Sequence, residues 1–275
     1  MSTMTADGTR RATHVTSPYR LNFLRTLRSE WIKIATLRST WWSIGITALL
    51  TVGIATLIAS TVSAADQFPM IQAVVSPIQF TMLLAGILGA ISVTGEYSTG
   101  MIRSTLTATP VRGMVLTAKA VVLAALLFIA SLVIFFGAAL VITPIAESKG
   151  LGLDWSDFDV TIRPILLASA AMAVFALIGV AFGFILRSGA GAIAATVGLL
   201  FVLPIVSMTF TMAGDAWQWI AEASRYLPMS AAQYAINPVP DGADGLTPEV
   251  AYLALAAWVA AGMLGGWAVL RTRDA

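Results

Sequence analysis

Six long apolar runs constrain this chain more than any other feature of its sequence. Each is long enough to cross a hydrocarbon core, which needs about 20 predominantly apolar residues. Inside a bilayer every backbone polar group must be satisfied internally, and a helix does this within a single segment. The sequence therefore predicts an all-α integral membrane protein with six transmembrane helices. We place these spans at residues 42–64, 77–94, 114–142, 164–186, 190–212 and 250–270.

The composition agrees with a membrane protein and excludes several kinds of site. Charged residues make up 11% of the 275 residues, against roughly 25% in soluble domains. Cysteine is absent, which excludes disulfides, thiolate metal sites and cysteine nucleophiles. The single histidine, His14, lies in a polar N-terminal tail without co-ligands, so we predict no metal site in this chain.

Basic residues are concentrated on one side of the predicted membrane. When the loops are taken alternately, only Lys149, Arg163 and Arg225 of the 16 lysines and arginines fall on the other side. Cytoplasmic loops carry the excess of positive charge in membrane proteins. We therefore expect a multi-pass protein of the plasma membrane whose N- and C-termini are both cytoplasmic.

The N-terminal region divides into a tail and an amphipathic segment. Residues 1–19 are polar, which is typical of a disordered cytoplasmic tail. Across residues 20–41 apolar residues recur three and four apart, while Arg25 and Lys33 lie on the opposite arc and Arg28 at its edge. This pattern predicts a helix that lies in the membrane interface. A juxtamembrane extension of the first span is the alternative.

Residues 95–113 form a polar island between the second and third apolar runs. The island is too short to bury a core of its own, and we expect a short helix on the membrane face that is available to a partner. Thr109 followed by Pro110 predicts that the next helix starts at Val111. A carboxylate at a helix C-terminus is disfavoured by about 0.3–1 kcal/mol. Glu96 is therefore expected to cap a following helix or to pair with Arg103 or Arg112, and a plain solvated charge is the alternative.

Two outer loops are long enough to carry structure of their own. Residues 143–163 are acidic and include Trp155 and Phe158, and residues 213–248 are rich in aromatic side chains. Aromatic residues of this kind sit well at the headgroup level. We expect one or two short helices in the second segment, dipping into the outer leaflet. An ordinary connector is the alternative.

Several kinds of chemistry are missing from the sequence. It contains no Gly-x-x-x-x-Gly-Lys-Ser/Thr stretch, so a P-loop nucleotide site is excluded. The central parts of the spans lack ionisable residues, which ion-driven transporters and intramembrane hydrolases normally need. Their small residues at helical spacing predict close helix packing. Examples are Gly86, Gly89, Gly179 and Gly183.

The island and the N-terminal segment resemble the ABC-2 family of ABC transporter permeases, in the version common among actinobacterial exporters. The layout agrees over residues 21–273, with six spans, a polar loop after the second and an aromatic outer segment before the sixth. The N-terminal part of the resemblance is Glu30-Trp31-Ile32-Lys33. The residues that carry it in the island and beyond are Gly95, Glu96, Tyr97, Gly100, Leu106, Pro110, Arg112 and Lys119.

The resemblance implies a half-transporter of the type V exporter-like architecture, with residues 42–273 as the six-helix domain. Residues 95–113 would be its coupling loop and residues 20–41 its connecting helix. Two copies, or one copy and a homologous permease, would form the pathway on two ABC ATP-binding subunits. Those subunits would bind ATP and Mg, so this chain itself would hold no cofactor and would not be an enzyme. The other partner is membrane lipid, and nucleic acid is not expected.

Three sets of residues follow as site expectations. Contact with the ATP-binding subunit is expected at the coupling loop that the resemblance implies, on Glu96, Tyr97, Met101, Arg103, Leu106 and Arg112. Arg187, a charge in the short loop between the fourth and fifth spans, is expected to add a second contact. The connecting-helix set is Arg25, Arg28, Glu30, Trp31 and Lys33. A substrate cavity between two copies would need apolar, adaptable side chains, and the resemblance points to Phe80, Met82, Phe201, Met208 and Phe210.

The function expected from these features is export of a drug, a peptide or a lipid-like molecule, driven by ATP hydrolysis on a separate subunit. An ion-coupled secondary transporter, an intramembrane enzyme and a non-transporting structural or sensory membrane protein are the alternatives. The missing charges in the spans count against ion coupling.

Overall fold

The fold was analysed in a computed structural model that describes residues 22–66, 68–109, 111–211, 217–239 and 244–272. Within these ranges the chain is helical and contains no strand, which confirms the all-α prediction. The expected tail at residues 1–19 lies outside them. The helices are α1 (Phe23–Thr36), α2 (Arg38–Thr61), α3 (Met70–Val75), α4 (Ile78–Ser98), α5 (Met101–Ala108), α6 (Arg112–Ser148), α7 (Arg163–Leu186), α8 (Gly189–Val197), α9 (Leu203–Thr211), α10 (Gln218–Ser224), α11 (Pro228–Ile236) and α12 (Pro248–Thr272).

Within the described residues, six helical stretches are long and apolar enough to span a membrane, as predicted. Their ends differ from the predicted ones, most clearly in α6, which continues to Ser148 and therefore shortens the outer loop expected at 143–163. The Lys149 ammonium that follows donates to the carbonyl oxygens of Ser60 and Val62 at the end of α2. A cation at a helix C-terminus is favoured by the helix dipole, so this contact holds the ends of α2 and α6 together.

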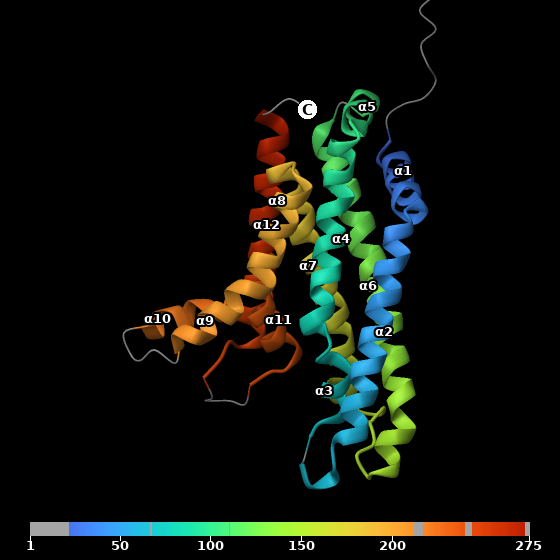
Figure 1. Cartoon of the computed structure of the whole chain (residues 1–275), viewed down its shortest axis with the longest axis vertical. Coiled ribbons are helices and arrows are strands. Elements are labelled where there is room, and N and C mark those ends of the chain that lie inside the picture. The colour runs from blue at the N-terminus through green and yellow to red at the C-terminus, as the bar shows by residue number, and fades with distance from the viewer. Residues whose placement is uncertain (1–21, 67, 110, 212–216, 240–243, 273–275) are drawn as a thin grey trace, which may run out of the picture.

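Helices α4 and α7 form the centre of the bundle, and their backbones touch (Figure 1). A Cβ atom added at Gly179 would collide with the carbonyl oxygen of Gly86, and one added at Gly89 would collide with that of Ala176. Glycine is required here because any side chain would force the two helices apart. The small residues in these spans are therefore packing residues.

We expect Gly179→Ala to push α4 and α7 apart and to lower the stability of the fold by about 1–3 kcal/mol, the usual range for overpacking. Gly53 of α2 is the matched control, because a Cβ atom there meets nothing within 4 Å. Thermal unfolding in detergent should show a lower midpoint for Gly179→Ala, and Gly53→Ala should leave it unchanged or slightly higher. Equal midpoints for the two variants would contradict the close packing.

The fifth span is bent. Helix α8 passes through a π-helical turn at Gly198–Val202 into α9, which contains Pro204 and runs out from the side of the bundle with α10 (Figure 1). π-turns and proline both interrupt the regular hydrogen bonds of a helix and allow such a bend. The aromatic segment that follows forms two helices: α10 packs on α9, and the buried α11 packs on α7 and α12.

Helix α1 is separate from the first span. Leu37, between α1 and α2, has an extended backbone, so the two helices are not one continuous rod and the break falls before residue 42. The face of α1 that is buried against the protein consists of Thr26, Glu30 and Ile34. From the sequence, the apolar arc of α1 was expected to face the membrane. The structure shows in addition a third face, with Glu30 at its centre, which packs on the helix bundle.

Candidate functional site

Four charged side chains meet inside the end of the molecule where α1 and α5 lie. We call Glu30, Lys33, Glu96 and Lys119 the charge quartet. The Lys119 ammonium lies 2.6 Å from Glu30 Oε2 and 2.6 Å from Glu96 Oε1. The Lys33 ammonium lies 2.7 Å from Glu30 Oε1 and 3.0 Å from Glu96 Oε1. Each carboxylate thus contacts both lysines, and the ring of four charges is neutral.

Further hydrogen bonds complete the quartet. Lys119 also donates to the backbone oxygen of Ser92 at 3.2 Å, and Lys33 donates to the Thr105 hydroxyl at 3.2 Å. An ammonium group has three donors, and both lysines have three partners here. The Thr105 hydroxyl in turn donates to Glu96 Oε2 at 3.4 Å. These bonds join α1, α4, α5 and α6 at one point.

The quartet is shielded from solvent. Glu30 and Lys119 are 1% exposed and Glu96 is 3% exposed, while the Lys33 side chain retains 21% exposure. Burial would lower the pKa of Lys33, but the hydrogen bond and charge of Glu30 and then those of Glu96 outweigh it and raise that pKa above its usual value. A raised lysine pKa means that the stabilisation is complete at neutral pH and is lost only as the pH rises above the usual lysine range.

Local structure explains how the four groups come together. Glu30 and Lys33 are three residues apart on α1 and so lie on neighbouring faces. Glu96 is in the last turn of α4, and Gly100 follows with a left-handed φ of 71°, which turns the chain into α5. Lys119 lies near the start of α6, where it faces back into the bundle.

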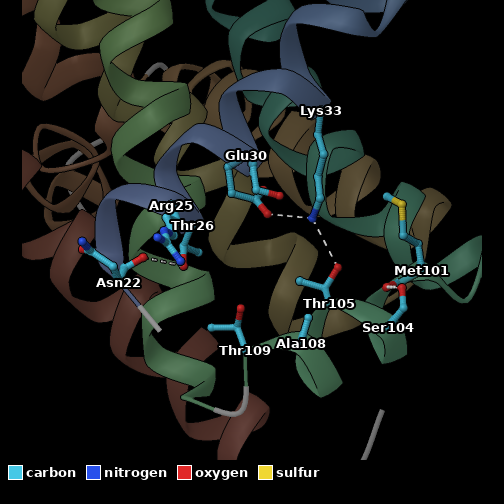
Figure 2. Close-up of a pocket in the computed structure, with 11 residues that line it drawn as sticks. Asn22, Arg25, Thr26, Glu30, Lys33, Met101, Ser104, Thr105, Ala108 and Thr109 are labelled. Atoms are coloured by element: carbon cyan, nitrogen blue, oxygen red, sulfur yellow. Dashed lines mark hydrogen bonds and ion pairs between the residues drawn. The ribbon is translucent and has the colours of Figure 1, made fainter. Parts of the chain in front are cut away.

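Helix α5 forms one wall of an open cleft of about 600 Å³ beside the quartet. Arg25 and Lys33 of α1 line the opposite wall (Figure 2), together with Ser29. On α5 itself Ile102 is buried, Leu106 is half-buried, and the outer face carries exposed side chains. The exposed residues are Met101, Arg103, Ser104, Thr107 and Ala108.

The family comparison agrees with this arrangement. A family model described as ABC-2 family transporter protein matches residues 27–272, almost the whole described chain. The chain belongs to the ABC-2 transporter family. It is thus the multi-pass membrane subunit of an ABC transporter, and the family implies that a partner subunit binds the nucleotide. Among curated proteins no sequence matches the chain.

The prediction that Glu96 of this ABC-2 protein pairs with Arg103 or Arg112 was wrong. Glu96 pairs with Lys33 and Lys119, and neither Arg103 nor Arg112 contacts it in the described structure. Arg103 is exposed on α5, and the Arg112 guanidinium donates to the backbone oxygen of Leu270 at 2.6 Å. Lys119 lies in the first turns of the predicted third span, which begins at residue 114. Apolar neighbours on every side of it were the signal that it is buried and needs acidic partners.

Arg112 and Arg187 attach α12 to the same end of the permease, and Tyr97 lies beside Arg187. Arg187, which has a left-handed φ of 53°, donates to the backbone oxygen of Val269 at 3.1 Å and lies 5.3 Å from the ring centroid of Tyr97. Together with Arg112 it binds carbonyl oxygens in the last turns of α12, which the helix dipole favours. Arg112 and Arg187 therefore hold α12 in place, and Tyr97 is half-buried beneath Arg187.

Helix α6 starts one residue later than predicted. Helix α6 begins at Arg112, with Val111 before it and no side-chain cap. Thr109 instead ends α5, and Pro110 lies outside the described residues.

The residues expected to line a substrate cavity between two copies differ in their exposure. Met82 is 2% exposed within the core, so its side chain is not available to a cavity between two copies. Phe80 and Met208 are exposed, Phe201 is half-buried, and the Phe210 ring lies 5.1 Å from that of Trp217. The expectation for Met82 was wrong because the apolar pattern of α4 does not distinguish the side that faces α7.

We expect Lys119→Met to be strongly destabilising, because it leaves two buried carboxylates with Lys33 as their only remaining cationic partner in the quartet. Loss of one member of a buried ion pair costs about 3–5 kcal/mol, which corresponds to a fall of roughly 10 °C in the thermal midpoint of a chain this size. Arg103→Met, at an exposed position, is the control and should change the midpoint little. Adding Glu96→Gln to Lys119→Met should recover part of the loss. A wild-type midpoint for Lys119→Met would refute the quartet.

Proposed function

We propose that this chain is the membrane-spanning subunit of an ATP-driven exporter and that α5 is the helix through which the ATP-binding subunit acts on it. The observation that carries the proposal is the charge quartet, which joins the short α5 to two membrane-spanning helices and to α1. In this proposal the α1 end faces the cytoplasm, and the substrate is a drug, a peptide or a lipid-like molecule that is moved outward.

A helix that receives force from another subunit must not slide or unfold under it. Helix α5 has only eight residues, and an isolated helix of that length is not stable in water. Here it is held by buried Ile102, and by Thr105, which bonds to both Lys33 and Glu96. A displacement of α5 is therefore passed directly to α4 through Glu96, and to α6 and α1 through the lysines.

The open cleft beside α5 supports a docking role. Its α1 wall is polar and basic, and its α5 wall carries the exposed apolar side chain of Met101. An apolar anchor within a polar rim is the usual composition of a protein interface. We propose that the ATP-binding subunit seats here, that two copies of the pair form the transporter, and that the second permease is an identical or homologous chain.

Ion coupling, the alternative, requires a carboxylate that gains and loses a proton during transport. Both carboxylates of the quartet have two lysine partners. Ion pairs made on both sides of each carboxylate suit a fixed structural link better than a proton carrier.

We expect Met101→Asp to weaken the binding of the ATP-binding subunit without unfolding the permease, because Met101 is 41% exposed on α5. Loss of one anchoring residue costs about 2 kcal/mol, or about thirtyfold in affinity. Binding is measured by pull-down of the co-expressed ATP-binding subunit from detergent, with Met101→Leu as the control that keeps an apolar side chain. Leu106→Asp is less suitable, because the half-buried Leu106 also packs on the protein. Wild-type binding and transport by Met101→Asp would overturn the docking role of α5.

We expect single cysteines to report the proposed orientation directly, because the natural chain contains none. Ser156 is exposed beyond the end of α6, and Ser104 and Ser188 are exposed near the opposite end. In intact cells an impermeant thiol reagent should label Ser156→Cys and should label Ser104→Cys and Ser188→Cys only after the membrane is opened. Labelling of Ser104→Cys from outside would reverse the orientation. Gly242, in the outer loop, lies outside the described residues and is a less suitable position.

A further inference from the structure

A second hollow lies between α1, α2 and α6, on the side of α1 away from the α5 cleft. It is an open groove of about 600 Å³. Leu27 and Trp31 of α1, Trp41 and Ile44 of α2, and the α6 face from Val121 to Ile134 line it. Because α2 and α6 are membrane-spanning helices, the groove opens toward the hydrocarbon of the bilayer.

The groove has one charged wall residue, Arg28, and no acidic residue among the described residues that line it. Arg28 is exposed on α1. A cation beside an apolar groove complements a ligand that has an anionic head and an apolar tail. A diacylglycerol or another neutral lipid would leave the arginine without a partner.

Two tryptophans, one from α1 and one from α2, line the groove. Trp31 is 47% exposed and Trp41 is 57% exposed. The Trp41 indole donates to the backbone oxygen of Ala35 at 2.9 Å, which anchors its polar edge against the end of α1. Tryptophan is enriched at the membrane interface because its ring is apolar and its N–H is polar.

The length of the groove matches a lipid tail. From Val121 to Ile134 the α6 wall extends about 20 Å, at about 1.5 Å per residue. One leaflet contributes about 15 Å of the hydrocarbon core, half of its thickness. An acyl chain whose headgroup lies at Arg28 would therefore follow the groove through its own leaflet.

We propose that this groove binds one anionic glycerophospholipid, with its phosphate on Arg28 and one acyl chain along α6. With the α1 end facing the cytoplasm, as proposed above, the bound lipid belongs to the cytoplasmic leaflet. The groove and its charge do not depend on that orientation. The site is on α1, which the quartet connects to α5 through Glu30 and Lys33. A bound lipid would therefore steady the helix that positions the docking cleft.

The test is native mass spectrometry of the detergent-solubilised full chain, titrated with dioleoylphosphatidylglycerol or with dioleoylphosphatidylcholine. We expect the first phosphatidylglycerol to bind about fivefold more tightly, since one basic residue near the headgroup is worth about 1 kcal/mol. Arg28→Gln should abolish this preference. Arg103→Gln, which removes an exposed arginine from α5, should retain it. Because the ATP-binding subunit is not needed for this measurement, its outcome is independent of the proposed docking.

A second variant tests the apolar part of the groove. Ala125 is exposed within it, and Ala125→Trp should fill it and remove the tight first lipid. Leu140→Trp, at an exposed position on the same helix outside the groove, is the control. Equal affinity of the natural chain for the two lipids overturns the proposal, as does a preference that survives Arg28→Gln. If Ala125→Trp reduces the dimer mass and leaves lipid binding unchanged, the groove is covered by a second copy and the proposal fails. If Ala125→Trp does not fold, Arg28→Gln decides the question.

Discussion

The arrangement of this end of the permease depends on the Lys119 ammonium, which lies between the carboxylates of Glu30 and Glu96 inside the protein. Each buried charge carries a desolvation cost of several kcal/mol, and only complete pairing offsets it. A quartet of this kind contributes little net stability compared with an apolar core, but partly formed states of it are strongly disfavoured. It therefore allows only one relative position of α1, α4 and α6, and this position fixes that of α5.

Helix α1 consequently has three different neighbours. One face carries Glu30 into the bundle, a second lines the cleft opposite α5, and a third borders the apolar groove with Trp31. A helix with three such faces does not fit the usual division into one polar and one apolar side. Helix α1 lines both the cleft beside α5 and the apolar groove, so any shift of α1 would change both hollows together.

Helix α4 makes two different kinds of contact along its length. Between α4 and α7, glycines bring the backbones into contact, and this packing tolerates no added side chain. At the end of α4 the contact is made by charged groups and hydrogen bonds instead. Because a close-packed interior transmits strain, we expect α4 and α7 to move together. Helix α8 still packs on this pair, and α9 runs out from the side of the bundle (Figure 1).

The sequence by itself determined the class of protein, the number of spans and the short helix after the second span, because these depend on local hydrophobicity, helix-breaking residues and charge. It also singled out Glu96, Lys33 and Lys119 as members of recognisable segments. Only the tertiary structure decided which charges pair, since Glu30, Glu96 and Lys119 lie far apart along the chain. The hydrophobic period of a helix shows which residues share its apolar face. It does not show which neighbouring helix packs against that face. For the same reason the sequence could not distinguish Met82, buried against the neighbouring helices, from exposed Phe80 on the same span.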